Sequence, residues 1–264
     1  MDLQSIRQQA SEIARQTGAA LLKLYEQPHE EKTKANINDV VTEGDLAAEA
    51  VIVPALRAHF PDDGIVSEEG GGTSGLPKSG CSWYIDPIDG TVNFASNLPY
   101  FSVSIALADA DMNPLVGVVY NPVYDELFSA ARGFGATLND KPIYVSSTPT
   151  LARSVLASGF PSNRATEPDN NLPEWTRILM NCRDLRRFGS AALELCFVAS
   201  GRLDGYWEQR LHAWDCLAGL LCVEEAGGRV SDYKGIPGAH VYNGDQIIAS
   251  NGLIHDEIVA TLGK

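Results

Sequence analysis

The first part of the chain places apolar residues at helical intervals with charged residues between them. The apolar positions are Leu3, Ile6, Ala10, Ile13, Leu21 and Leu24. This spacing predicts a helix that runs to about Gln27, where Pro28 stops it. A polar loop follows, and a second helix is predicted to begin near Thr42, because Asp45 three positions later completes a pattern like a capping box. Pro54 is expected to kink this second helix.

Shorter apolar or alternating runs follow, and they are typical of strands. They fall at Ile65–Val66, Trp83–Ile85, Val103–Leu107, Leu115–Tyr120 and Glu126–Ala130. Short turns such as Asn121-Pro122 join several of these runs. The first part of the chain is therefore predicted to be α+β, with helices stacked on a mainly antiparallel sheet.

From Val155 onward, strands alternate with helices. Strands are predicted at Val155–Ser158, Tyr206–Glu208 and Ile247–Ser250, and helices at about Ser190–Ser200, at Trp214–Ala226 and at the end of the chain. This alternation predicts an α/β half. We divide the chain into an N-terminal half, residues 1–150, and a C-terminal half, residues 151–264. A loop-like composition at Pro161–Pro173 marks the region of the boundary.

Composition limits the possible classes of protein. The chain has 264 residues, and 44% of them are hydrophobic, which suits a globular enzyme with a sizeable core. The formal net charge of −14 argues against nucleic-acid and membrane partners, because both favour clusters of Lys and Arg. The five cysteines are scattered without Cys-x-x-Cys spacing, which indicates reduced thiols in a cytoplasmic protein. No stretch resembles a signal peptide or reaches membrane-spanning length.

The most informative motif is Asp86-Pro87-Ile88-Asp89-Gly90-Thr91, which follows the apolar run Trp83–Ile85. Pro87 biases Asp86 toward extended backbone, so we expect the strand to end there with the Asp86 side chain at its tip. Gly90 permits a tight turn, and Thr91 begins a segment whose free N–H groups can bind phosphate. Two carboxylates this close repel each other unless a divalent cation lies between them. The motif indicates a metal site, and the alternative is an ordinary surface turn.

Three further acidic segments are candidates to join this turn. They are Asp39 to Asp45 before the second helix, Ser67-Glu68-Glu69 after a short strand, and Trp214-Asp215 in the first turn of a helix. Taken alone, each is typical of a helix cap or a solvated carboxylate. Their order along the chain is what makes them informative together.

In that order, these segments resemble the inositol monophosphatase family of lithium-sensitive, magnesium-dependent phosphatases. The intervening segments Asn93-Phe94, Arg187–Ala192, Tyr206–Glu208 and Glu225–Gly228 are also similar to that family. The resemblance spans nearly the whole chain. It implies a five-layered αβαβα sandwich of the sugar-phosphatase type, usually a homodimer, that hydrolyses a small phosphate monoester with Mg²⁺.

The resemblance also implies which residues bind metal. Glu68, Asp86 and the backbone carbonyl of Ile88 would hold one ion, and Asp86, Asp89 and Asp215 a second, with a third and looser ion near Glu68. A ligand set made only of oxygens, without His or Cys, suits Mg²⁺ rather than Zn²⁺.

For catalysis, the resemblance implies that Thr91, hydrogen-bonded to Asp45, helps to orient a water that a metal ion activates for attack on phosphorus. The backbone of Asp89, Gly90 and Thr91 would cradle the phosphate. Lys34, on the polar loop, would close over the metal ions.

Substrate recognition would fall to Gly189, Ser190, Ala191 and Glu208, together with Asp215. Glu208 would accept hydrogen bonds from sugar or cyclitol hydroxyls, or pair with an amine such as that of histidinol phosphate. Ser190 stands where Thr is usual in the animal enzymes and keeps the hydroxyl, so the chain departs in pocket shape and not in chemistry. The stretch Ser162–Glu174 resembles an insertion and has no assigned role.

Two other groups of residues are less informative. His212 and Cys216 lack an orienting partner, so packing is a simpler interpretation than a nucleophilic dyad. Arg183, Arg186 and Arg187 form a basic cluster that is typical of ion pairs in a strand or at a dimer contact. If this cluster bound phosphate, a bisphosphate substrate would be favoured.

Four functions remain open. The favoured one is hydrolysis of inositol monophosphate or a similar polyol phosphate, followed by the same chemistry on histidinol phosphate, and then on 3′-phosphoadenosine 5′-phosphate or fructose 1,6-bisphosphate. The fourth is a regulatory or binding protein that keeps the fold without turnover. The full set of carboxylates argues against this fourth function, because a binding module has no physical need for such a cluster of like charges.

Overall fold

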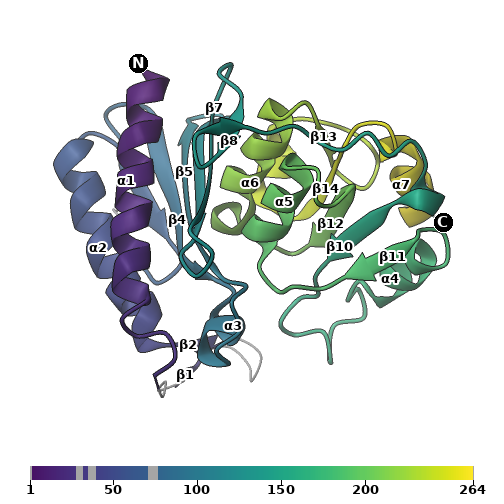
Figure 1. The fold of residues 1–264 in the computed structure, drawn as a ribbon, viewed down its shortest axis with the longest axis horizontal. Helices are drawn as coiled ribbons and strands as arrows, with labels where there is room; N and C mark the ends of the chain where they lie inside the picture. The colour runs from purple at the N-terminus through teal and green to yellow at the C-terminus, as the bar shows by residue number, and fades with distance from the viewer. Residues whose placement is uncertain (1, 28–31, 35–39, 71–76, 264) are drawn as a thin grey trace.

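The computed structural model describes residues 2–27, 32–34, 40–70 and 77–263. Within them, two large sheets alternate with three groups of helices (Figure 1). The layers follow in the order helices, sheet, helices, sheet, helices. The predicted αβαβα sandwich is confirmed.

The outer layer of the N-terminal half is formed by α1 (Leu3–Leu21) and α2 (Glu43–His59). Helix α1 ends earlier than predicted, because residues 22–27 form turns and Glu26 takes a positive φ of 67°. Helix α2 begins as predicted, with Thr42 as N-cap and Asp45 completing the capping box. Pro54 lies inside α2, which continues to His59. A small antiparallel pair, β1 (Lys32–Thr33) and β2 (Val40–Val41), lies before α2 in the chain.

The first large sheet has the strand order β3-β4-β5-β6-β7-β8-β9 and is antiparallel except for the parallel pair β3 and β4. Along β5, Val103, Ile105 and Leu107 pack with the residues of α1 and α2, whereas Ala106 and Ala108 pack on the opposite side with α6. This alternation is what buries both faces of the sheet. The strands are β3 (Gly64–Ser67), β4 (Cys81–Asp89), β5 (Ser102–Asp109), β6 (Pro114–Asn121), β7 (Glu126–Ala131), β8 (Ala136–Leu138) and β9 (Lys141–Pro142).

Strand β4 does not end at Asp86, as the Asp86-Pro87 pair predicted, but continues to Asp89. Asp86 lies opposite Ser104 and Asp89 opposite Ser102, so β4 contains one residue more than β5 over this interval. Such a bulge bends the strand and redirects its side chains. Gly90 then takes a positive φ of 99°, and the short helix α3 (Thr91–Ala95) begins, as the turn signal predicted.

The middle layer consists of α5 (Ala191–Ala199) and α6 (Ala213–Glu225), which lie between the two sheets (Figure 1). Gly117 on β6 lets α6 approach closely, because a Cβ there would lie 2.6 Å from the backbone oxygen of Ala218. The middle helices therefore pack directly on the sheet that carries Asp86.

The second sheet has the strand order β11-β10-β12-β14-β13, and α4 (Leu172–Leu179) and α7 (His255–Leu262) pack together over its outer face. Two of its strands and α4 were not predicted. The loop-like stretch 161–173 connects β10 to α4 inside this half, and not between the two sheets. The strands are β10 (Val155–Ser158), β11 (Asp184–Arg186), β12 (Gly205–Gln209), β13 (Arg229–Ser231) and β14 (Gln246–Ser250), and two 3-10 turns span Leu151–Arg153 and Ala239–Asn243.

Among the helices of the described ranges, we find none with both the length and the apolar character that crossing a membrane requires.

Candidate active site

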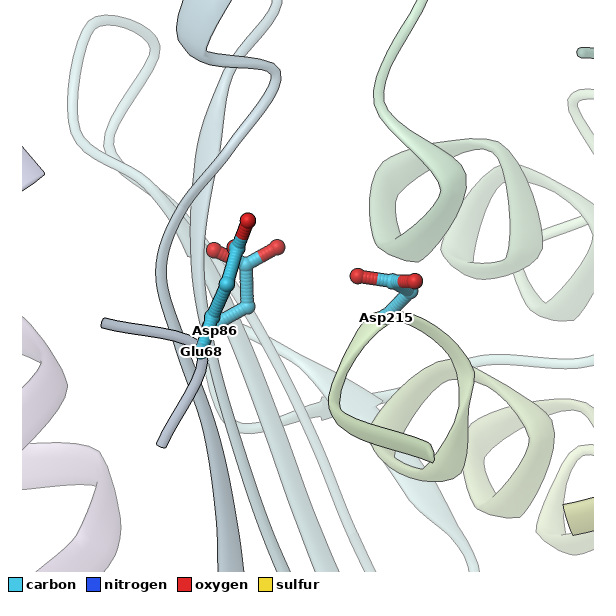
Figure 2. A group of neighbouring side chains, drawn as sticks. All are labelled: Glu68, Asp86 and Asp215. Carbon is cyan, nitrogen blue, oxygen red and sulfur yellow. The ribbon is translucent and has the colours of Figure 1, made fainter. Parts of the chain in front are cut away.

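Three carboxylates from distant parts of the chain lie close together (Figure 2). Glu68 directly follows β3, Asp86 lies on β4, and Asp215 lies in the first turn of α6. One oxygen from each lies within 4.8 Å of the others. The fold thus brings two acids from the β3 and β4 side of the first sheet together with one from the middle layer of helices. Their arrangement is able to hold a cation.

The backbone fixes two of these carboxylates. Asp86 accepts a hydrogen bond of 3.0 Å from the N–H of Ile88, and Asp215 accepts one of 2.7 Å from the N–H of His212. Burial raises the pKa of Asp86, and the negative charges of Glu68, Asp89 and Asp215 raise it further. Burial also raises the pKa of Asp215, against the hydrogen bond from His212. A bound cation would relieve this repulsion and keep the carboxylates ionised.

Asp89 lies outside this trio and is held by the start of α5. It accepts hydrogen bonds from the Ser190 hydroxyl at 2.6 Å and from the N–H groups of Ala192 at 2.8 Å and Ala191 at 3.1 Å. Burial raises its pKa to about 6, although these hydrogen bonds favour the ionised form. Asp89 therefore ties the end of β4 to the middle layer, next to the residues predicted to contact substrate.

The predicted pair of Thr91 and Asp45 is present. The Thr91 hydroxyl lies 3.3 Å from Asp45 Oδ1 and 3.1 Å from the carbonyl oxygen of Ile88. Asp45 is fully buried, and its other oxygen accepts hydrogen bonds from the N–H of Thr42 at 2.7 Å and from the Thr42 hydroxyl at 2.8 Å. Burial raises the pKa of Asp45 to about 6. The capping box of α2 thus also positions the acid that contacts Thr91.

Lys34 reaches the acidic trio from the polar loop. Its Nζ lies 3.0 Å from Glu68 Oε1 and also donates a hydrogen bond to Glu69. Burial lowers the pKa of Lys34, but the hydrogen bonds from Lys34 to Glu69 and Glu68 outweigh it and raise the pKa overall. Asp39, which formed part of the acidic pattern in the sequence, lies outside the described residues.

These residues surround a cavity of about 230 Å³. The acidic trio and the turn of residues 88–91 form one part of its wall, and Gly189, Ser190, Ala191 and Glu208 form another. A wider hollow of about 490 Å³, which Lys34, Trp214 and residues 160–162 also line, shares many of these residues. Every residue predicted for the site lines one of these spaces except Asp45, which lies behind Thr91.

The cavity also contains residues that the sequence analysis missed. Glu194, on α5, and Ser162, in the stretch without an assigned role, line it, and so does Arg187, for which ion pairing was the simpler expectation. Glu194 carries the only charge in α5, whose other residues are all apolar. This isolated charge is the signal from which the sequence could have identified Glu194 as a site residue. A chain of hydrogen bonds holds the stretch in place, because Asn171 accepts from Trp207 Nε1 and donates to the Gly159 carbonyl.

His212, Cys216 and Arg186 behave as the simpler interpretations predicted, whereas Arg187, from the same basic cluster as Arg186, lines the cavity. Arg186 pairs with Asp184 at 2.6 Å within β11. The Cys216 thiol is buried, and it contacts the backbone carbonyl of His212 at 3.4 Å. The imidazole of His212 instead lies beside the indole of Trp214, with ring centroids 4.6 Å apart.

The fold and the acidic site, which is able to hold a metal ion, define a phosphatase of the sandwich type. The model of the protein family described as "Inositol monophosphatase family" matches residues 2–264 of this chain. An inositol-1-monophosphatase of Synechocystis is 44% identical over 261 residues, which cover 99% of this chain and 90% of that protein. The solved structure of the inositol monophosphatase from Anabaena superposes with a TM-score of 0.89 at 41% identity, covering 100% of this chain and 97% of the other.

A relative with a different name is almost as similar. The Nus factor SuhB of Haemophilus influenzae is 43% identical over 248 residues, which cover 94% of this chain and 92% of that protein.

The match to the family model and the similarity to the two inositol monophosphatases show that the chain belongs to the inositol monophosphatase family and that it is a phosphatase.

Proposed function

We propose that the protein is a Mg²⁺-dependent phosphatase that hydrolyses a small phosphate monoester, above all inositol monophosphate or a similar polyol phosphate. The observation that carries this proposal is the meeting of Glu68, Asp86 and Asp215 beside the Thr91 and Asp45 pair. We assign one ion to Glu68, Asp86 and the Ile88 carbonyl and a second to Asp86, Asp89 and Asp215, with a third and looser ion near Glu68, as the resemblance to the family implies. A donor set made only of oxygens fits Mg²⁺ better than Zn²⁺.

When bound, Mg²⁺ would supply a lowered pKa for a coordinated water and compensation for charge on the phosphate oxygens. The protein supplies orientation. The Thr91 hydroxyl donates a hydrogen bond to Asp45 or to the Ile88 carbonyl, so its oxygen lone pair faces away from them and is able to accept a hydrogen bond from water, which orients that water. Asp45 is buried behind Thr91 and holds it in this orientation.

The test is phosphate release from myo-inositol 1-phosphate, histidinol phosphate, 3′-phosphoadenosine 5′-phosphate, fructose 1,6-bisphosphate and β-glycerophosphate, each with Mg²⁺ and with chelator. We expect release that needs Mg²⁺ and is fastest for the inositol ester. Millimolar lithium should inhibit it. Release that chelator does not affect would contradict the assignment of the metal site, and release from none of these esters would contradict the proposed activity.

We also propose a homodimer in the cytoplasm. All five cysteines are free, as expected in a reducing compartment. A mainly apolar groove lies on the surface and offers a contact area for a second copy; it is lined by Tyr100, Tyr124, Phe188, Phe197 and Leu203 together with the ion pair of Glu126 and Arg202. Analytical ultracentrifugation at micromolar concentration would show a mass of two chains, and a monomer would contradict the proposal.

A second candidate comes from the name that several relatives carry, that of a Nus factor. It corresponds to the regulatory function considered from the sequence. An Asp86→Asn variant, which should release no phosphate, distinguishes the phosphatase function from a Nus function. If this variant still replaces SuhB in Escherichia coli cells that lack their own, the chain has a Nus role that is independent of turnover. If neither the variant nor the wild type replaces SuhB in these cells, the result would contradict the Nus role.

A further inference from the structure

Besides the acidic trio and Asp89, two more carboxylates line the same cavity. Glu194 comes from the first turn of α5 and Glu208 from β12. Both are buried, with 1% and 6% of their surfaces exposed. Buried acids are costly unless their oxygens are satisfied, so their surroundings indicate what they bind.

Each of these carboxylates has one oxygen held by the protein. Glu194 Oε1 accepts a hydrogen bond of 2.7 Å from the N–H of Phe188, and Glu208 Oε2 accepts one from the Tyr206 hydroxyl. For each, the other oxygen makes no hydrogen bond to any residue in the described ranges. These two oxygens are acceptors that water or a ligand in the cavity is able to satisfy.

Arg187 provides hydrogen-bond donors at the same cavity. Its side chain is exposed and folds against Gly189, where a Cβ would lie 2.8 Å from Arg187 Nη1. Burial raises the pKa of both Glu194 and Glu208, and attraction to Arg187 opposes that rise in each case. The wall beyond the acidic trio therefore combines two acceptors with a guanidinium whose charge acts on both.

This combination distinguishes between possible leaving groups. A hydroxyl both donates and accepts hydrogen bonds, so it matches carboxylate oxygens and guanidinium N–H groups at once. An ammonium group would be attracted by the two carboxylates, but it only donates, so it leaves the Arg187 N–H groups without an acceptor and its charge is repelled by Arg187. A second phosphate would be attracted by Arg187, but it only accepts at neutral pH, so it leaves both carboxylates without a donor and its charge is repelled by them.

We propose that Glu194 is a specificity-determining residue that contacts the substrate, and that with Glu208 it accepts hydrogen bonds from two hydroxyl groups of a polyol leaving group, within reach of Arg187. This inference rests on the proposed phosphatase function and narrows its substrate class to polyol phosphates, in preference to amines and bisphosphates.

The test is Glu194→Gln, because the glutamine oxygen still accepts from the Phe188 N–H while an NH₂ group replaces the oxygen that faces the cavity. The matched control is Glu257→Gln, since Glu257 accepts with one oxygen from the backbone N–H of Leu151, away from the cavity. The substrates are myo-inositol 1-phosphate, histidinol phosphate and para-nitrophenyl phosphate, which has no hydroxyl on its leaving group. Calorimetric binding of myo-inositol with inorganic phosphate adds a readout that does not need turnover.

We expect Glu194→Gln to lower kcat/KM on myo-inositol 1-phosphate about tenfold, mainly through KM, and to weaken myo-inositol binding by a similar factor. Activity on para-nitrophenyl phosphate should stay within about twofold of the wild type, and Glu257→Gln should match the wild type on every substrate. Equal losses on every substrate would mean that Glu194 only positions residues 188–190, and a larger loss on histidinol phosphate would indicate an amine. Either result would overturn the inference.

Failure of the phosphatase proposal is separable from failure of this one. If the wild type releases phosphate from none of the esters, the activity is wrong, and the calorimetry alone then decides whether Glu194 binds a polyol. If the wild type hydrolyses para-nitrophenyl phosphate with Mg²⁺ but Glu194→Gln leaves myo-inositol binding unchanged, the activity stands and the inference is overturned.

Discussion

Replacing Asp215 with Asn is expected to stabilise the metal-free protein while it abolishes phosphate release. Asp215 shares the acidic trio with Glu68 and Asp86, whose oxygens lie within 4.8 Å. Two unit charges at this distance repel by about 3.5 kcal/mol when the effective dielectric constant is about 20. The amide keeps an oxygen to accept from the His212 N–H, so the start of α6 should remain intact.

The net increase in the free energy of unfolding of Asp215→Asn should be smaller than the sum of two such repulsions. Partial protonation of the trio and water in the cavity both reduce the repulsion that the folded state experiences. We therefore expect the free energy of unfolding to rise by about 2–3 kcal/mol at pH 7.5 in chelator. The pKa of Asp215 is raised on folding, so its penalty is absent below pH of about 4 and grows as pH rises above that value. The advantage of the variant should disappear in acid.

Urea unfolding followed by tryptophan fluorescence measures this gain with chelator and with Mg²⁺. Mg²⁺ should stabilise the wild type, because it binds the folded state, and should stabilise the variant much less. Asp109→Asn is the control of opposite sign: burial raises the pKa of Asp109, but hydrogen bonds from Asn113 outweigh it, so the loss of this carboxylate should destabilise the protein. If Asp215→Asn is no more stable than the wild type in chelator, or if Mg²⁺ stabilises both equally, the proposed repulsive metal site is wrong.

Three further predictions concern other parts of the molecule. Gly159→Ala would place a Cβ 2.1 Å from Glu208 Oε1 and displace that carboxylate, so preference for myo-inositol 1-phosphate over para-nitrophenyl phosphate should fall with little change in melting temperature. Gly117→Ala meets the backbone of α6 instead, and should cost about 2 kcal/mol or more in urea unfolding, whereas a neutral result would refute the close approach. Burial lowers the pKa of His255 to about 4, so the wild type should lose up to about 3 kcal/mol as pH falls from about 6.5 to 4, and His255→Asn should show a flatter profile over that range.

Local signals in the sequence predicted the features that depend on a few neighbouring residues. The Thr42 and Asp45 capping box set the start of α2, and Gly90 marked the turn into α3. The alternation at Val103–Leu107 gave strand β5. The meeting of Glu68, Asp86 and Asp215 required the resemblance to the family, because no local pattern joins residues so far apart in the chain.

What the sequence did not predict depends on contacts across the fold. Strand β4 continues past Pro87 because β5 pairs with it on the far side of a bulge, and pairing partners are not visible in the local pattern. The short strands β11 and β13 have three residues each, too few for a periodic signal. Glu194 looked like one charge on a helix, and its place in the cavity became evident only when α5 was set between the sheets.

Helix α5 has a consequence for how such an enzyme changes over evolution. Its first turn holds Asp89, from the end of β4, and also carries Glu194, which faces the cavity beside Glu208 from β12. The carboxylates Glu68 and Asp86 belong to one sheet, whereas the residues around Glu208 belong to the other. We therefore expect substitutions at the ends of β10 and β12 to alter which alcohol is accepted without displacing Glu68 and Asp86. A single turn of α5 thus connects the end of β4 near the metal site to the part of the cavity that we expect to select the alcohol.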